Sequence, residues 1–171
     1  MISPPVPFIA LREQEAAAVR VGFCPVVKHP ALFHGEAIEP PDGPARFGQL
    51  NFQRQRLCVF SRLCQVCGRP IGGRGWTLDV ETPDPLACLD CFPVAWEHCP
   101  GLHRQKAGFL IVETYRVTVE FLFAHQVAEQ WNLEIPAGIT HIAGKALMQA
   151  ATLTRVVYAQ GEELAARTVG A

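Results

Sequence analysis

The alternation of apolar and polar residues is clearest over residues 109–123. The apolar side chains there fall on one parity, at Phe109, Ile111, Tyr115, Val117, Val119, Phe121 and Phe123. The other parity carries Thr114, Arg116, Thr118 and Glu120. A period of two predicts a strand with one buried face, or two strands that meet at a bend. Further on, the pattern predicts a short helix over 142–150 and a final strand over 153–159.

Helical spacing is strongest over residues 49–63, which contain no Pro or Gly. Their apolar positions lie near one stripe, formed by Leu50, Leu57, Phe60 and Cys64. We therefore expect a helix that leads directly into the first cysteine pair. A second short helix is predicted over 10–23, where Leu11 and Val19 can share a face. Residues 25–44 are rich in proline, which removes backbone donors, and are expected to be mostly loop.

Composition and charge exclude several classes of protein. The chain has 171 residues, of which 49% are hydrophobic and 18% charged, so disorder of the whole chain is excluded. A formal net charge of −1 excludes a globally basic nucleic-acid binder, although a local basic face remains possible. The longest apolar run, 109–124, is interrupted by charges at Glu113, Arg116 and Glu120, and we expect no membrane span. The first ten residues lack the basic region of a signal peptide, which favours a cytoplasmic protein.

The seven cysteines include two pairs with metal-ligand spacing. Cys64 and Cys67 form one CxxC pair, Cys88 and Cys91 form the second, and 20 residues separate the pairs. In a cytoplasmic protein such spacing indicates metal binding before disulfides, and four thiolates suit tetrahedral Zn²⁺. We therefore predict one structural zinc ion held by these four cysteines.

The surroundings of the two pairs predict a particular fold. Gly68 follows Cys67, where a tight knuckle needs an unhindered residue. Residues 88–99 can form a helix of about three turns, with thiolates at its positive N-terminal end. A knuckle, a β-rich excursion and a cysteine pair on the first turn of a helix are typical of a treble-clef zinc finger. The predicted fold is therefore α+β, with a Pro-rich N-terminal arm over 1–45, a treble-clef module over 46–104, and a C-terminal sheet and short helix over 105–171.

Two segments carry a resemblance to known proteins. Residues 56–68 (RLCVFSRLCQVCG) resemble the helix-then-knuckle entry of treble-clef domains in the HNH endonuclease superfamily. Residues 85–91 (PLACLDC), followed by 97–102 (EHCPGL), are similar to a set of small uncharacterised bacterial zinc-finger proteins. The resemblance covers about residues 46–104, and it implies zinc ligation by the same four cysteines.

The resemblance does not extend to nuclease activity. HNH catalysis needs a general-base histidine between the cysteine pairs, with a further Asn or His at the metal and phosphate. Residues 68–87 contain neither His nor Asn, and we expect no HNH chemistry. The acids of this segment, Asp79, Glu81 and Asp84, are interpreted as solvated turn residues.

Charge is unevenly distributed around the predicted finger. Residues 46–78 contain six arginines and no Asp, Glu or Lys, whereas 79–97 contain five acids and no base. The arginines predicted to bind a nucleic acid or a protein partner are Arg54, Arg56, Arg62, Arg69 and Arg74. The alternative is that these arginines pair across the finger with the acids that follow them in 79–97, which would make the module neutral.

The leading functional hypothesis is a non-catalytic zinc-binding protein that uses this arginine-rich face to bind nucleic acid or a protein. The rival hypothesis is an enzyme with its site between the zinc module and the C-terminal sheet. His98, Cys99 and His103 are the clustered titratable residues that would serve such a site. The sequence leaves open which hypothesis holds, and it does not decide the oligomeric state.

Overall fold

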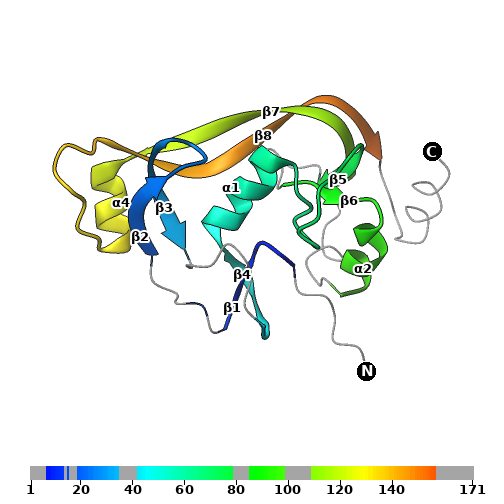
Figure 1. The fold of residues 1–171 in the computed structure, drawn as a ribbon, viewed down its shortest axis with the longest axis horizontal. Coiled ribbons are helices and arrows are strands. Elements are labelled where there is room, and N and C mark those ends of the chain that lie inside the picture. The colour runs from blue at the N-terminus through cyan, green and yellow to red at the C-terminus, as the bar shows by residue number, and fades with distance from the viewer. Residues whose placement is uncertain are drawn as a thin grey trace.

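The protein has an α+β fold built on one long, twisted sheet. The computed structural model describes residues 7–13, 15, 19–34, 42–78, 85–98 and 109–156. Within these residues the main sheet has six strands in the order β2-β3-β8-β7-β5-β6, and β1 and β4 form a separate pair (Figure 1). The strands are β1 Ala10–Arg12, β2 Val19–Cys24, β3 His29–His34, β4 Ala45–Leu50, β5 Gly75–Leu78, β6 Ala87–Cys88, β7 Phe109–Phe123 and β8 His141–Val156. The described helices are α1 Phe52–Ser61, α2 Cys91–His98 and α4 Ala124–Trp131.

The antiparallel pair β7–β8 runs along the long axis of the molecule (Figure 1). The strand predicted over 109–123 is confirmed, and Val117 and Val119 lie partly buried on the side that faces α1, as the alternation requires. A β-bulge lies between Val119 and Phe121, and beyond it the apolar side chains of this parity are no longer buried. Phe121 and Phe123 are 49% and 51% exposed, because α1 does not extend over this part of the sheet.

The helix predicted over 49–63 is confirmed as α1. Asn51 caps its N-terminus, with Oδ1 accepting a hydrogen bond from the Arg54 N–H at 2.9 Å. Arg62 ends the helix in the left-handed conformation, with φ of 51°. The helix packs beneath β7–β8 and beside β3, and its position brings the chain to Cys64 (Figure 1).

Two predictions near the N-terminus are wrong. Residues 10–23 form no helix where they are described, since Ala10–Arg12 is β1 and Val19–Cys24 is β2. Part of the expected loop over 25–44 is strand β3, which pairs with β2 and, in parallel at Ala31, with β8. The physical reason is that β2 and β3 bury Cys24, Ala31 and Phe33 against the sheet, and this packing outweighs local propensity.

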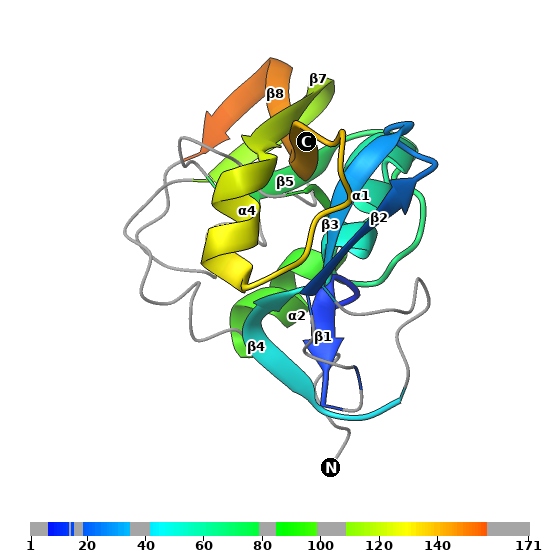
Figure 2. The same ribbon diagram turned by 90° about the vertical axis from the view of Figure 1, so that its left-hand side faces the viewer.

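The C-terminal prediction is also wrong in part. Residues 142–150 form strand β8 in place of the predicted helix, because β7 supplies a continuous partner for them. The strand predicted over 153–159 is present as far as Val156. Helix α4 was not predicted, and it lies together with the β2–β3 hairpin at one end of the molecule (Figure 2).

The buried residues form clusters at both ends of β7–β8. One cluster surrounds the four cysteines and includes Trp76, Phe92 and Phe109. Two smaller clusters lie around the β2–β3 hairpin and α4. The division at residues 45 and 104 stays a prediction, and residues 157–171 lie outside the described part of the chain. None of the described helices has the length and apolar character needed to cross a membrane.

Candidate metal centre

The first cysteine pair lies in a tight turn directly after α1. Backbone hydrogen bonds close the turn, from Gly68 N to Cys64 O and from Cys64 N to Arg69 O, each 2.8 Å. Gly68 has φ of +73°, and a Cβ at this position would come within 2.8 Å of the Phe8 ring. Both observations explain why glycine follows Cys67, as the sequence predicted.

The second pair is divided between a strand and a helix. Cys88 ends strand β6, which pairs with β5, and Cys91 is the first residue of α2. The helix therefore begins three residues later than Cys88, and one cysteine of the pair, not both, belongs to it. The knuckle, the β5–β6 hairpin and the start of α2 bring the two pairs together.

The four sulfur atoms of Cys64, Cys67, Cys88 and Cys91 all lie within 4.8 Å of one another. The Cys67 and Cys88 sulfurs are 3.9 Å apart, and those of Cys88 and Cys91 are 3.2 Å apart. Four ligands at a Zn–S distance of about 2.3 Å in a tetrahedron have sulfurs about 3.8 Å apart. All four thiols are free of disulfides. The donor set and its spacing therefore suit a tetrahedral metal ion.

Backbone and side-chain donors surround the sulfurs. The Cys64 Sγ accepts from the N–H groups of Val66, Cys67 and Cys88 at 3.3–3.4 Å. Arg69 donates from Nε to the Cys67 Sγ at 3.5 Å. Such donors stabilise thiolates, which are the form of cysteine that binds metals.

The pKa values show why the cluster needs a cation. Burial raises the pKa of Cys88 to about 11, and burial also raises the pKa of Cys91. For Cys67, burial raises the pKa, but hydrogen bonds headed by that from Arg69 outweigh it and bring the pKa to about 6. Four thiolates this close repel one another, so they can all be charged only with a positive ion between them.

Aromatic side chains cover the cysteine cluster. Trp76 donates from Nε1 to the Cys88 carbonyl at 3.1 Å, and its ring meets that of Phe92 edge-on at 4.9 Å. Trp96 stacks on Phe92 at 5.8 Å between ring centroids. These rings and Phe109 belong to the apolar cluster around the candidate metal centre.

Two of the arginines predicted to bind a partner are buried, which corrects that prediction. Arg54 and Arg56 are both 0% exposed. Arg54 pairs with Glu15 at 2.5 Å, and Arg56 donates from Nη1 to the Gly144 carbonyl at 3.0 Å. Helix α1 directs both side chains inward, so neither can form part of an exposed binding face. No local sequence pattern indicated Glu15 as the partner of Arg54.

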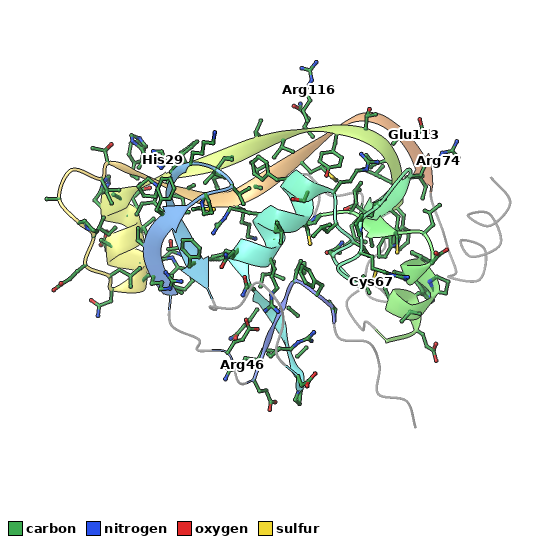
Figure 3. The ribbon with its side chains drawn as sticks, in the orientation of Figure 1. His29, Arg46, Cys67, Arg74, Glu113 and Arg116 are labelled. Carbon is green, nitrogen blue, oxygen red and sulfur yellow. The ribbon has the colours of Figure 1, made fainter. Side chains whose placement is uncertain are left out.

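The other three arginines contact groups of the same chain. Arg62 donates to the carbonyls of Gly73 and Glu113 and lies over the Tyr115 ring. Arg69 donates to Cys67, and Arg74 forms an exposed ion pair with Glu113 at 2.8 Å (Figure 3). The one ion pair among these contacts is with Glu113, which lies outside 79–97, so pairing with the acids of 79–97 stays a prediction. Whether these three arginines also bind a partner stays a prediction.

The residues of the rival enzyme hypothesis are mostly outside the described part. Cys99 and His103 lie outside the described residues. So do Asp79, Glu81 and Asp84, which we interpret from the sequence as turn residues. His98 is described as the last residue of α2. The hypothesis of a site built on His98, Cys99 and His103 therefore stays untested.

The four cysteines are, among the described residues, the one group of three or more His, Cys, Asp or Glu side chains placed to share a metal ion. The resemblance to treble-clef and HNH proteins rests on the sequence segments alone. Comparison of the chain with protein-family models, with curated proteins and with solved structures finds no match.

Proposed function

We propose that this chain is a non-catalytic zinc-binding protein whose four-cysteine centre is structural and of the treble-clef type. The observation that carries the proposal is the convergence of the four cysteine sulfurs to within 4.8 Å of one another. They come from a knuckle, the end of a hairpin strand and the first turn of a helix, which is the order of parts expected of a treble clef.

A structural role follows from the donor set. Four thiolates complete a tetrahedral zinc site and leave no open position for a water or a substrate, whereas catalytic zinc sites keep one open. Residues 68–87 also supply no His or Asn for HNH chemistry. Metal-binding free energy in such modules, about 10–16 kcal/mol, is largely folding free energy.

We still expect the protein to bind a partner, but the set of arginines that could take part is smaller than predicted. Arg54 and Arg56 are excluded by burial, so an arginine face would consist of Arg62, Arg69 and Arg74. Each of these already contacts a group of the chain. We therefore regard the zinc module as the scaffold and expect a partner, protein or nucleic acid, to bind elsewhere.

Elemental analysis of purified protein tests the metal proposal. We expect one zinc per chain in the wild type and less than half of that in Cys67→Ser, which removes a partly exposed ligand. Cys24→Ala is the matched control, because Cys24 is a buried free cysteine that belongs to another core cluster. Wild-type protein that is folded and free of metal, or equal zinc loss in both variants, would contradict the proposal.

A further inference from the structure

Exposed aromatic rings gather at the end of the molecule that carries α4. We call the surface formed by five of these residues the Phe–His surface: Phe121, Phe123, His29, His125 and His141. Phe121 and Phe123 are about half exposed, and the side chains of His125 and His141 are exposed. Large apolar groups exposed together on a folded chain mark a surface of interaction.

The rings form a row of two contacting groups across neighbouring strands. His29 meets Phe121 edge-on with 5.0 Å between ring centroids. Phe123 lies 5.0 Å from His141 and 5.6 Å from His125. The row therefore extends from β3 over β7 to β8 and to the first turn of α4.

Strand pairing places these rings on one face. Phe121 and Phe123 have the same parity in β7, and Phe123 is paired with His141 in β8. Phe121 is paired with Ala143, which is also the parallel partner of Ala31, two residues after His29. Because side chains of equal parity share a face, the row is set by the sheet rather than by a loop.

The β2–β3 hairpin beside the rings carries only positive charge. Residues 19–34, which form the β2–β3 hairpin and its turn, contain Arg20 and Lys28 and no Asp or Glu. Both side chains are exposed, and Lys28 directly precedes His29. The nearest acids along β7 and α4 are Glu120 and Glu129. Strand alternation turns Glu120 to the opposite face, whereas Glu129, one helical turn after His125, and Glu134 are exposed and bound the rings on the α4 side.

We propose that the Phe–His surface binds single-stranded nucleic acid. Bases stack on exposed aromatic rings of a sheet face with little sequence preference, and basic side chains beside them contact the phosphates. A duplex presents no free base faces to such rings, which favours a single strand. A surface for an apolar protein segment would not need the acid-free border that the β2–β3 hairpin provides.

The inference goes beyond the zinc proposal and does not depend on it. Figure 3 shows His29 and Cys67 at opposite ends of the molecule. The buried residues around His29 and those around the cysteines also belong to different clusters. The binding surface can therefore be tested on protein whose zinc content is measured separately.

Fluorescence anisotropy with labelled oligothymidylate and oligouridylate of about twelve nucleotides provides the test, since comparable single-strand sites cover about 4–16 nucleotides. We expect binding at low salt that weakens about fivefold or more in Phe121→Ala and in Phe123→Ala. Phe60→Ala is the matched control, because Phe60 is 40% exposed but lies on α1, and its affinity should equal that of the wild type.

Salt dependence gives a second measurement that a folding defect would not imitate. Two phosphate contacts, at Arg20 and Lys28, predict a slope of log affinity against log salt of about −1.4. Lys28→Gln should make the slope shallower by about 0.7. Phe123→Leu, which keeps an apolar side chain without a ring, should weaken binding as Phe123→Ala does.

The outcomes separate the two proposals. Absence of binding to both oligonucleotides at low salt, or equal affinity in the wild type and both Phe→Ala variants, overturns the inference. Self-association of the wild type that the Phe variants abolish, without any oligonucleotide binding, also overturns it in favour of a protein interface. Binding by protein that contains no zinc would support the surface while contradicting the metal proposal.

Discussion

Glu15 is the residue at which three buried hydrogen-bond donors meet. Its carboxylate accepts from the Arg12 N–H at 2.7 Å, from Asn51 Nδ2 at 3.1 Å and from Arg54 Nη2 at 2.5 Å. The side chains of Glu15 and Arg54 are 3% and 0% exposed. One carboxylate thus compensates a buried cation and links the N-terminal segment to the start of α1.

We predict that Glu15→Gln destabilises the fold by about 3–5 kcal/mol, because it leaves the Arg54 charge buried without its counter-ion. The free energy of unfolding in urea measures the effect. The control is Glu113→Gln, which removes an ion pair with Arg74 whose side chains are 47% and 49% exposed. That loss should stay below about 1 kcal/mol. Similar losses in the two variants would contradict the role given to Glu15.

At the scale of elements, α1 is joined to the sheet by a polar contact as well as by apolar packing. Gln55 donates from Nε2 to the Ala146 carbonyl at 2.8 Å and accepts from the Ala146 N–H at 3.2 Å. The amide of one side chain thereby takes the place of a neighbouring strand at this point of β8. Because the contact is buried, neither backbone group can turn to water instead.

We predict that Gln55→Ala costs about 1–3 kcal/mol, since it leaves the buried N–H and C=O of Ala146 without partners. Hydrogen exchange followed by NMR should show the Ala146 amide losing protection. Gln53→Ala provides the control, because Gln53 lies on the same helix and contributes no hydrogen bond to Ala146. An Ala146 amide that stays protected in Gln55→Ala would refute this account of how α1 is held.

The elements that could be predicted from the sequence are those with a clear local period. Helix α1 and strand β7 follow from periods of about 3.6 and 2. The part of β8 over 142–150 could not be predicted, because Ala146, Leu147, Met148 and Gln149 are helix formers and their strand state depends on pairing with β7. Short strands such as β1 depend on distant partners in the same way.

The candidate site was predictable to different degrees for the same reason. CxxC spacing is a local property of the sequence. Cys64, Cys67, Cys88 and Cys91 could therefore be identified as candidate metal ligands before the fold was known. The exposure of an arginine depends on what packs against it, and the burial of Arg54 and Arg56 was therefore not predictable. The exposure of Phe121 and Phe123 depends on how far α1 extends over the sheet. The alternating pattern of β7 does not reveal this.

Considered as a whole, the molecule has two ends that depend on different interactions. Around the cysteines, β5, β6 and α2 are short and contain two to eight residues each. Elements of this size are marginal without a cross-link or a metal. At the other end, α4, the β2–β3 hairpin and the adjoining part of β8 pack around Leu32, Val127 and Ile142. That packing includes no cysteine of the candidate centre.

We therefore predict that a chelator unfolds the cysteine end while the α4 end persists. Trp76 and Trp96 pack against the cysteine cluster, whereas Trp131 packs in the cluster at α4. In Trp131→Phe, zinc removal should shift the remaining tryptophan fluorescence to longer wavelength and raise deuterium uptake over residues 64–78 and 85–98. In a Trp76→Phe, Trp96→Phe variant the emission of Trp131 should not move. A simultaneous shift of both reporters would show that β7 and β8 couple the two ends into one cooperative unit, and would contradict the prediction.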